Sequence, residues 1–285
     1  MSFKAAAVQM CSGVDPARNA AAMARLVREA AAQGATYVQT PEMTGMLQRD
    51  RDAARAVLAD ETHDIIVKTG SELARELGIY MHVGSTAIAL AHGKIANRGF
   101  LFGPDGRILN RYDKIHMFDV DLDNGESWRE SAAYTAGSEA RVLSLPFAEM
   151  GFAICYDVRF PALFRAQAVA GAEVMTVPAA FTKQTGEAHW EILLRARAIE
   201  NGVFVVAAAQ AGRHEDGRET FGHSMIIDPW GTVLASAGAT GEAVIVAEID
   251  PSAVKAAHDK IPNLRNGREF SVEKIAGAVA GGVAA

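Results

Sequence analysis

The stretch Gly151-Phe-Ala-Ile-Cys-Tyr-Asp-Val-Arg-Phe-Pro161 combines a short strand, a polar bend and the start of a helix. Its first four residues are apolar, which is typical of a buried strand. Pro161 opens an apolar helical run over 162–169, at the first-turn position where proline is tolerated. Cys155 lies at the bend, where a side chain is held at the sheet edge and backbone N–H groups point toward whatever it attacks. The alternative is a buried structural thiol, since free cysteine is among the most buried residue types.

On either side of this stretch, strands alternate with helices, and hairpins interrupt the alternation. Apolar runs predict strands at 3–10, 35–40, 79–85, 108–112, 141–145, 173–177, 204–209, 224–227, 233–235 and 243–249. Capping residues and apolar periodicity predict helices from Asp15-Pro16 to Gly34, from 64 to 77, from 187 to 201 and after Pro251. Residues 88–90 and 95–102 are predicted to pair as a hairpin.

This order of elements favours an α/β fold other than a doubly wound parallel sheet. Two mixed sheets packed on each other, with helices outside both, accommodate the hairpins. Similar turns at 102–109 and 227–234 hint at two related halves. Because no low-complexity linker separates the halves, we expect one domain over 1–285. The acidic segment 119–131 is predicted to be a long functional loop, and the small apolar residues 279–285 to be frayed or docked on a partner chain.

The composition argues against several classes of protein. The chain has 285 residues, 49% of them hydrophobic, which is enough for one large domain with a substantial core. The net charge of -6 and the lack of a basic run argue against nucleic acid or an anionic membrane as a partner. No apolar stretch of about eighteen residues predicts a membrane span. The two cysteines, Cys11 and Cys155, are too few for a disulfide scaffold, and no signal-peptide pattern is present, so we expect a reducing cytoplasm.

Three reactive side chains follow predicted strands. Glu42 follows the strand that ends at Thr40-Pro41, Lys114 follows the strand that ends at Tyr112, and Cys155 follows the strand 151–154. Groups at strand ends can meet at one edge of a sandwich. A thiol attacks well once a base takes its proton, and a carboxylate shielded from water can be that base. An ammonium can stabilise the oxyanion that forms.

Simpler interpretations compete with this one. Glutamate and lysine at strand ends are most often solvated loop residues. A cysteine–histidine pair with His116, His189 or His223 is an alternative, although none of these histidines has a distinguishing context. No two histidines or cysteines have metal-ligand spacing, so we expect no metal. Cys11, at the end of the first strand, is predicted to serve packing.

Four ordered motifs resemble those of the nitrilase superfamily of carbon–nitrogen hydrolases. They are Pro41-Glu42, Arg111-Tyr-Asp-Lys114-Ile-His116, the stretch around Cys155, and Arg195-Ala-Arg-Ala-Ile-Glu-Asn201. The resemblance spans about residues 3–255. It implies an α/β fold, namely a four-layer α-β-β-α sandwich of two mixed sheets that pairs into an eight-layer homodimer. It also implies an enzyme without a cofactor.

The same resemblance assigns roles to residues. Glu42 is implied to be the general base, Lys114 the oxyanion-stabilising ammonium and Cys155 the nucleophile. The backbone N–H of Tyr156 is implied to be a second oxyanion donor. A further glutamate stands beside this triad in many members, and Glu130 in Trp128-Arg-Glu-Ser131 matches its position.

The segment His116-Met-Phe-Asp-Val-Asp121 and the acidic residues after it are similar to the Nit branch of omega-amidases and deaminated-glutathione amidases. The similarity implies a small monoamide whose far end carries a carboxylate, cleaved to acid and ammonia through a thioester. Arginine grips carboxylates bidentately, so the candidate cations are Arg129, Arg159 and Lys183, with Arg159 alternatively paired to Asp157 or Glu200. Phe181 and Thr182 are implied, by analogy, to line the pocket.

Other functions remain open on the sequence. The same triad would serve an N-carbamoyl amino acid amidohydrolase or a nitrilase. A different class is a non-catalytic protein that uses Cys155 as a redox sensor or its dimer face as a scaffold. The expected partners are a small amide and further copies of the chain, in a homodimer or larger homo-oligomer. Residues 256–285 are expected to be a tail that docks on the core or on a partner subunit.

Overall fold

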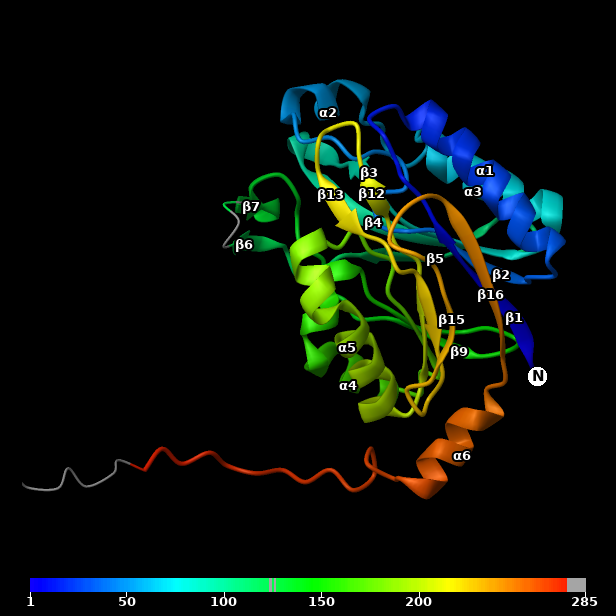
Figure 1. Cartoon of the computed structure of the whole chain (residues 1–285), viewed down its shortest axis with the longest axis vertical. Coiled ribbons are helices and arrows are strands. Elements are labelled where there is room, and N and C mark those ends of the chain that lie inside the picture. The colour runs from blue at the N-terminus through cyan, green and yellow to red at the C-terminus, as the bar shows by residue number, and fades with distance from the viewer. Residues whose placement is uncertain (123–124, 126, 276–285) are drawn as a thin grey trace, which may run out of the picture.

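The computed structural model describes residues 1–122, 125 and 127–275. The described residues form an α/β fold with two six-stranded mixed sheets (Figure 1). The strand order is β16-β1-β2-β3-β4-β5 in the first sheet and β15-β14-β11-β10-β9-β8 in the second. Each sheet therefore mixes parallel strands from crossovers with antiparallel strands from hairpins, as the sequence predicts.

The first sheet collects the N-terminal strands and one strand from the other end of the chain. Its members are β1 (Phe3–Gln9), β2 (Tyr37–Gln39), β3 (Tyr80–Ala89), β4 (Ile95–Phe102), β5 (Ile108–Asp113) and β16 (Ala243–Ile249). β1, β2 and β3 run parallel, whereas β4, β5 and β16 join through antiparallel pairs. The predicted hairpin is confirmed, with Ala89 paired to Ile95. β3 is one continuous strand, where the sequence suggested a break after Ser85.

Helices α1 (Pro16–Ala32) and α3 (Ile65–Leu77) cover the outer face of this sheet. Asp15 and Asp64 cap their first turns by accepting hydrogen bonds from backbone N–H groups. Gly78, with φ of 65°, ends α3 in the left-handed conformation that glycine adopts freely. Apolar helix residues such as Met23 and Leu73 pack on strand residues that include Val38, Val83 and Phe100.

The second sheet is covered by α4 (Pro161–Val169) and α5 (Lys183–Asn201). Its strands are β8 (Val142–Ser144), β9 (Glu149–Phe152), β10 (Val174–Thr176), β11 (Phe204–Ala207), β14 (Met225–Ile227) and β15 (Val233–Ser236). α5 begins four residues before the predicted start at Glu187. Its first turn is mostly polar, so the apolar period begins later than the helix itself.

The inner faces of the two sheets share one core. Ala5, Ala7 and Tyr37 of the first sheet belong to the same buried cluster as Phe152 and Val205 of the second. Hydrogen bonds also join the sheets, because Ala208 donates its N–H to Gln39 Oε1 at 2.9 Å and Ala211 donates to the Met10 carbonyl at 2.8 Å. These contacts fix the strand ends of one sheet against those of the other.

Shorter elements gather at one end of the sheets, beyond what the sequence predicted. Two hairpins lie there, β6 (Asp119–Asp121) with β7 (Ser127–Arg129) and β12 (Ala211–Arg213) with β13 (Glu219–Phe221). The predicted loop 119–131 thus contains a hairpin and the 3₁₀ helix η2 (Glu130–Ala132). The short helix α2 (Arg51–Val57) was not predicted either, and it has no buried residue to give an apolar period. A further 3₁₀ turn, η1 (Ala91–Gly93), connects β3 and β4.

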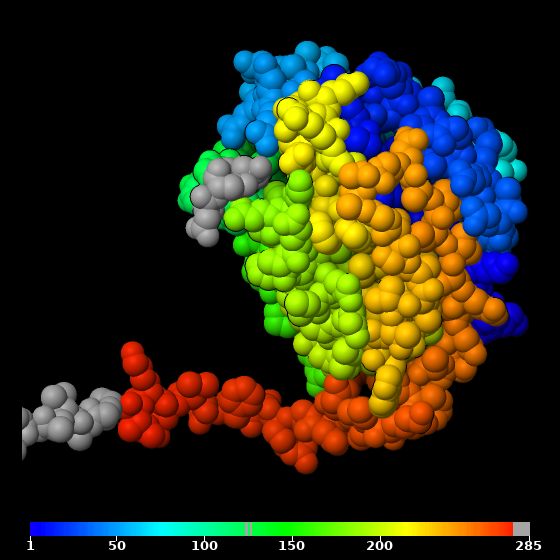
Figure 2. Space-filling view, viewed as in Figure 1, coloured from blue at the N-terminus to red at the C-terminus, as the bar shows by residue number. Residues whose placement is uncertain are grey.

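The chain leaves its body after α6 (Ser252–Lys260), as Figures 1 and 2 show. Arg165 still holds this segment by donating to the Asn263 carbonyl at 2.8 Å. Beyond it, residues 267–275 are exposed, including Phe270 at 85%. The predicted frayed or docked stretch 279–285 falls outside the described residues. Among the helices of the described ranges, none is long and apolar enough to cross a membrane.

Candidate active site

Cys155 lies in a strained bend between β9 and α4. It begins the 3₁₀ helix η3 (Cys155–Arg159) with φ of 48°, a left-handed conformation that costs a non-glycine residue about 1–3 kcal/mol. Its N–H donates to the Pro178 carbonyl at 2.9 Å, and the Asp157 carboxylate accepts from the Ile154 N–H at 2.9 Å. These bonds hold the bend in place and leave the Cys155 side chain at the edge of the sheet, 8% exposed.

The buried carboxylate of Asp157 also connects this bend to the strand that carries Lys114. The Tyr112 hydroxyl donates to Asp157 Oδ2 at 2.8 Å, and the His116 N–H donates to Oδ1 at 3.0 Å. The His116 ring nitrogen Nδ1 is 2.6 Å from the same oxygen. Because Tyr112 and His116 flank Lys114 along the chain, Asp157 fixes the position of Lys114 relative to Cys155.

Lys114 lies between two carboxylates. Its Nζ donates to Glu42 Oε1 at 2.9 Å and to the two oxygens of Glu130 at 3.1 and 2.9 Å. Backbone groups hold the carboxylates from their other sides, with Ala180 N–H donating to Glu42 at 2.8 Å and Phe118 N–H donating to Glu130 at 2.7 Å. Lys114 is 2% exposed and Glu42 4% exposed. Each of these buried charges is therefore paired and hydrogen-bonded, which such burial requires.

Asn97 of β4 is a member of this cluster that the sequence analysis did not identify. Its Nδ2 donates to Glu42 at 2.9 Å and to Glu130 at 3.2 Å, so one amide bridges both carboxylates. Its Oδ1 is buried and has no protein partner among the described residues. Asparagine is depleted in strands, and a polar residue inside the apolar run 95–102 was the available signal.

Burial and charge act against each other in this cluster. Burial alone would raise the pKa of Glu42, but Lys114, the Cys155 thiol and the Ala180 N–H together hold that pKa below its ordinary value. Burial would lower the pKa of Lys114, and the charges of Glu130 and Glu42 instead hold it well above its ordinary value. Burial and the charge of Glu42 raise the pKa of the Cys155 thiol well above its ordinary value. A protonated thiol therefore faces an ionised carboxylate, and their interaction lowers the pKa of Glu42 and raises that of the thiol.

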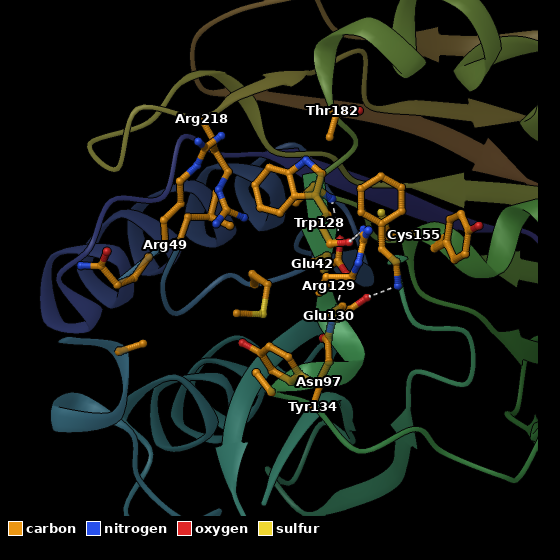
Figure 3. A pocket seen from close by; sticks show the side chains of 18 of the residues that line it. Glu42, Arg49, Asn97, Trp128, Arg129, Glu130, Tyr134, Cys155, Thr182 and Arg218 are labelled. Atoms are coloured by element: carbon orange, nitrogen blue, oxygen red, sulfur yellow. Dashed lines mark hydrogen bonds between the residues drawn. The ribbon is translucent and has the colours of Figure 1, made fainter. Parts of the chain in front are cut away.

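These groups line a pocket of about 550 Å³, within the range that holds small ligands. The cluster is shown in Figure 3 with Glu42 and Glu130 beside Cys155. The pocket walls come from α2, from the hairpins β6–β7 and β12–β13, and from the segment after β10. Short elements that the sequence analysis did not predict thus form much of the wall around Glu42, Lys114 and Cys155, which it did predict.

Four of the remaining predicted site residues line the pocket and two do not. Tyr156, Phe181, Thr182 and Arg129 are lining residues. Lys183 is absent from the lining, and its Nζ lies 3.7 Å from Glu219. Arg129 is exposed, and its guanidinium forms two hydrogen bonds of 2.9 Å with Asp121.

Arg159 also lies outside the lining, and its expected ion pairs are wrong. Its guanidinium is 3.3 Å from the His189 ring nitrogen and lies over the Phe181 ring at 5.2 Å. Asp157 is already occupied by the hydrogen bonds described above. Glu200 pairs with Arg197 at 2.6 Å.

Other sequence hypotheses can be compared with the structure. None of the hydrogen bonds among the described residues joins Cys155 to His116, His189 or His223. Cys11 is exposed, so its assignment to packing is wrong; its Sγ lies 3.5 Å from the Arg213 carbonyl. Within the described ranges, no three His, Cys, Asp or Glu side chains are grouped to hold a metal ion.

The pocket mouth holds three side chains that the sequence analysis missed. The guanidinium carbons of Arg49 and Arg218 lie 4.9 and 4.8 Å from the centre of the Trp128 ring. In the view of Figure 3, both arginines lie on the far side of Trp128 from Cys155. Arg49 and Arg218 lie in loops without apolar period and Trp128 lies in the short strand β7, so no sequence pattern could bring them together.

Comparisons with known proteins identify the family of this chain. The carbon–nitrogen hydrolase family model matches residues 4–259. The chain is 39% identical over 271 residues to a deaminated glutathione amidase of Yersinia enterocolitica, covering 93% of each protein. It is 35% identical to the omega-amidase NIT2 of Homo sapiens, covering 95% of this chain and 98% of that protein.

Among solved structures, the crystal structure of the C. elegans NitFhit protein has a TM-score of 0.86 and 34% identity to this chain. The match covers 94% of this chain and 65% of NitFhit, so the chain spans about two thirds of that longer protein. The family match, the relatives and the similar structure lead to one conclusion: this chain belongs to the carbon–nitrogen hydrolase family, in the Nit branch of the nitrilase superfamily.

Proposed function

We propose that this carbon–nitrogen hydrolase cleaves the amide bond of a small carboxylate-bearing amide, with Cys155 as nucleophile, Glu42 as general base and Lys114 as oxyanion-stabilising ammonium. One observation carries the proposal: the ionised Glu42 contacts both the Cys155 thiol and Lys114, the latter at 2.9 Å, in a pocket that all three line. The fold itself does not require a buried carboxylate, thiol and ammonium in mutual contact. Their arrangement therefore indicates a functional site. The amidase names of the relatives support the same reaction class.

The reaction follows from the positions of these groups. Glu42 takes the thiol proton as the sulfur attacks the amide carbon, so the thiolate forms only when it is used. Lys114 and the backbone N–H of Tyr156 stabilise the oxyanion. Glu42 then gives the proton to the leaving nitrogen, and ammonia departs from a thioester. The same carboxylate activates a water molecule, which releases the acid and restores the thiol.

Glu130 has a supporting role in this scheme. It shares Lys114 with Glu42 and is itself held by the Phe118 N–H, so it fixes the ammonium in position. Phe181 and Thr182 form part of the pocket wall.

The substrate class is proposed from the relatives. Deaminated glutathione and the omega-amide of a 2-oxo dicarboxylic acid are the favoured substrates, and the relatives named deaminated glutathione amidase and omega-amidase support this class. Both substrates carry a carboxylate away from the amide that is cleaved.

A panel of small amides tests the proposal. The purified protein is expected to release ammonia from an omega-monoamide, and a thioester on Cys155 is expected in the mass spectrum after rapid acid quench. Cys155→Ala is expected to retain only background activity, because the nucleophile and its base act as one unit. Cys11→Ala is the matched control and is expected to keep full activity, since Cys11 is exposed and outside the pocket lining.

Two results would overturn the mechanism. One is full activity in Cys155→Ala. The other is hydrolysis without any adduct on Cys155. Carbon dioxide release from an N-carbamoyl amino acid, or consumption of a nitrile in preference to every amide, would retain the triad and replace the substrate class.

We further propose that the two sheets with their outer helices form a four-layer α-β-β-α sandwich, in one domain over 1–285, that pairs into an eight-layer dimer. Large apolar side chains exposed on the second half support a partner surface, with Ile192 of α5 70% exposed and Val169 of α4 66% exposed. The tail 256–285 would dock on the core or on the partner subunit. Light scattering of the full chain tests this, because a monomer at micromolar concentration would contradict it.

A further inference from the structure

The pocket is positively charged although the protein is acidic. Of the described residues that line it, six are cationic and three are acidic, whereas the whole chain carries a net charge of -6. Lys114 on the floor is neutralised by Glu42 and Glu130. The remaining cations are arginines at the mouth (Arg49, Arg51, Arg55, Arg129 and Arg218). A cleft lined by one sign of charge attracts ligands of the other sign.

Two of these arginines are held in place with their donors unused. The Arg218 Nε donates to the Asp216 carboxylate at 2.9 Å, and the Asp216 side chain is only 1% exposed. This bond orients the guanidinium, and neither Nη atom of Arg218 has a partner among the described residues. Arg49 has no hydrogen bond or ion pair to any described residue, and its guanidinium lies over Trp128.

Both guanidinium groups contact the ring of Trp128. Both lie within 5 Å of the ring centre, at 4.9 and 4.8 Å, and each guanidinium is attracted to the ring electrostatically. Burial lowers the pKa of Arg218, and the like charge of Arg49 lowers it further, an effect that a bound anion would oppose. A carboxylate is planar and matches the fork of a guanidinium.

We propose that Arg49 and Arg218, which both contact Trp128, form the receptor for the carboxylate at the far end of the substrate. This inference rests on the proposed amidase function for its substrate. It assigns substrate specificity to the pocket mouth and not to Arg129, Arg159 or Lys183, whose guanidinium or ammonium groups already contact Asp121, His189 and Glu219.

Two matched amides test the receptor. Succinamate and butyramide share the amide and the chain length, and differ in carrying a carboxylate or a methyl group. Arg49→Gln and Arg218→Gln are each expected to raise KM for succinamate about 10- to 100-fold, the value of a lost charge-assisted hydrogen bond, with little change in kcat. KM for butyramide is expected to stay within about two-fold of the wild-type value, because uncharged chain ends gain nothing from the cations.

Further variants keep the test decisive. Arg218→Gln leaves the buried Asp216 without its cation, so Arg218→Lys is measured as well. Lysine keeps the positive charge but lacks the forked donors of a guanidinium. Arg218→Lys is therefore expected to recover part of the succinamate affinity. Arg107→Gln is the control for charge alone, since Arg107 is exposed and pairs with Asp105 away from the pocket. It is expected to change neither KM.

Binding to Cys155→Ala separates the two proposals. Calorimetry with succinamate needs no hydrolysis, so it measures the receptor even if the wild type hydrolyses neither amide. Loss of binding in the Arg49→Gln and Arg218→Gln backgrounds supports the receptor. Equal changes for succinamate and butyramide, or unchanged succinamate binding in both backgrounds, would overturn it. Absence of hydrolysis with intact, arginine-dependent binding would overturn only the proposed function.

Discussion

The floor and the mouth of the pocket treat charge in opposite ways. On the floor, Lys114 and Glu42 are nearly inaccessible to solvent, and every charge has an opposite charge and a hydrogen bond. At the mouth, Arg49 is exposed, and both arginines on Trp128 keep unused donors. On the floor, each charged group already has protein partners. At the mouth, the unused donors of Arg49 and Arg218 are available to a ligand. We infer that the floor performs the chemistry and that the mouth selects the substrate.

The backbone is also held more firmly on the floor than at the mouth. Floor residues follow strands and are braced by buried groups such as Asp157, which links the Lys114 and Cys155 segments. Mouth residues belong to short hairpins and a helix without a buried residue. Preorganised groups stabilise a transition state without reorganisation, so the braced region is suited to catalysis. Changes on the floor should therefore alter kcat and stability, and changes at the mouth should alter KM.

The largest expected effect is the loss of the base on the floor. Glu42→Gln is expected to lower kcat by about 10²- to 10⁴-fold, because the thiol, whose pKa is raised, then has no group to take its proton. Steady-state ammonia release measures this. Glu76→Gln, which removes an exposed carboxylate paired with Arg28, is the matched control and is expected to change nothing. If Glu42→Gln kept the wild-type kcat, the assignment of the chemistry to the floor would be wrong.

The pH dependence sharpens this first prediction. Because the folded-state pKa of Glu42 lies below its unfolded value of about 4.3, the ionised carboxylate stabilises the fold above that pH. This contribution is lost as pH falls through the folded-state pKa. Urea unfolding is therefore expected to show a stability difference between wild type and Glu42→Gln that shrinks as pH falls below 4.3. A difference that grows on acidification would contradict the sign of the shift.

The second effect is on folding. Lys114→Met is expected to cost about 3–5 kcal/mol of unfolding free energy, because Glu42 and Glu130 would remain as uncompensated buried charges. Arg49→Gln at the mouth is expected to cost no more than about 0.5 kcal/mol. Urea denaturation measures both, and Lys114→Met with Glu130→Gln should recover part of the loss by removing one carboxylate. Similar losses for Lys114→Met and Arg49→Gln would contradict the comparison.

The sequence predicted the floor far better than the mouth, for a physical reason. Glu42, Lys114 and Cys155 each follow a strand that the sequence predicts, and strand patterns can be read locally. Glu42 and Lys114 follow β2 and β5 of the first sheet and Cys155 follows β9 of the second, so the three groups meet at one edge of the packed sheets. Asn97 was missed because its role depends on which face of β4 meets the two carboxylates.

The mouth carries no such local pattern. Arg49, Trp128 and Arg218 come from three distant segments, and their contact exists only in the folded chain. α2 buries no side chain, so it lacks the apolar stripe by which a helix is recognised. The family resemblance could transfer catalytic residues with their motifs, but the cations it suggested at Arg159 and Lys183 lie outside the pocket lining. Recognition by loops is the part of such a site that sequence patterns describe least.

The third effect concerns the amide that bridges both floor carboxylates. Asn97→Ala is expected to lower kcat about 10-fold, because Glu42 loses one hydrogen bond to its charged form and keeps those from Lys114 and Ala180. The loss of a donor also raises the pKa of Glu42, so the acid limb of kcat/KM is expected to move to higher pH. The pH profile separates this from a loss of packing, which would lower the rate equally at every pH.

The smallest expected effect is that of salt, and it probes the mouth alone. Raising ionic strength from about 0.01 to 0.1 M shortens the screening length from about 30 to about 10 Å, so exposed arginines attract an anionic amide less. KM for succinamate is expected to rise a few-fold, while kcat stays constant because the floor charges are buried and paired. Butyramide provides the uncharged control, and Arg49→Gln should flatten the salt dependence for succinamate. A salt effect on kcat would mean that solvent ions reach the charges on the floor. An equal effect on the KM of both amides would mean that the mouth does not select the carboxylate.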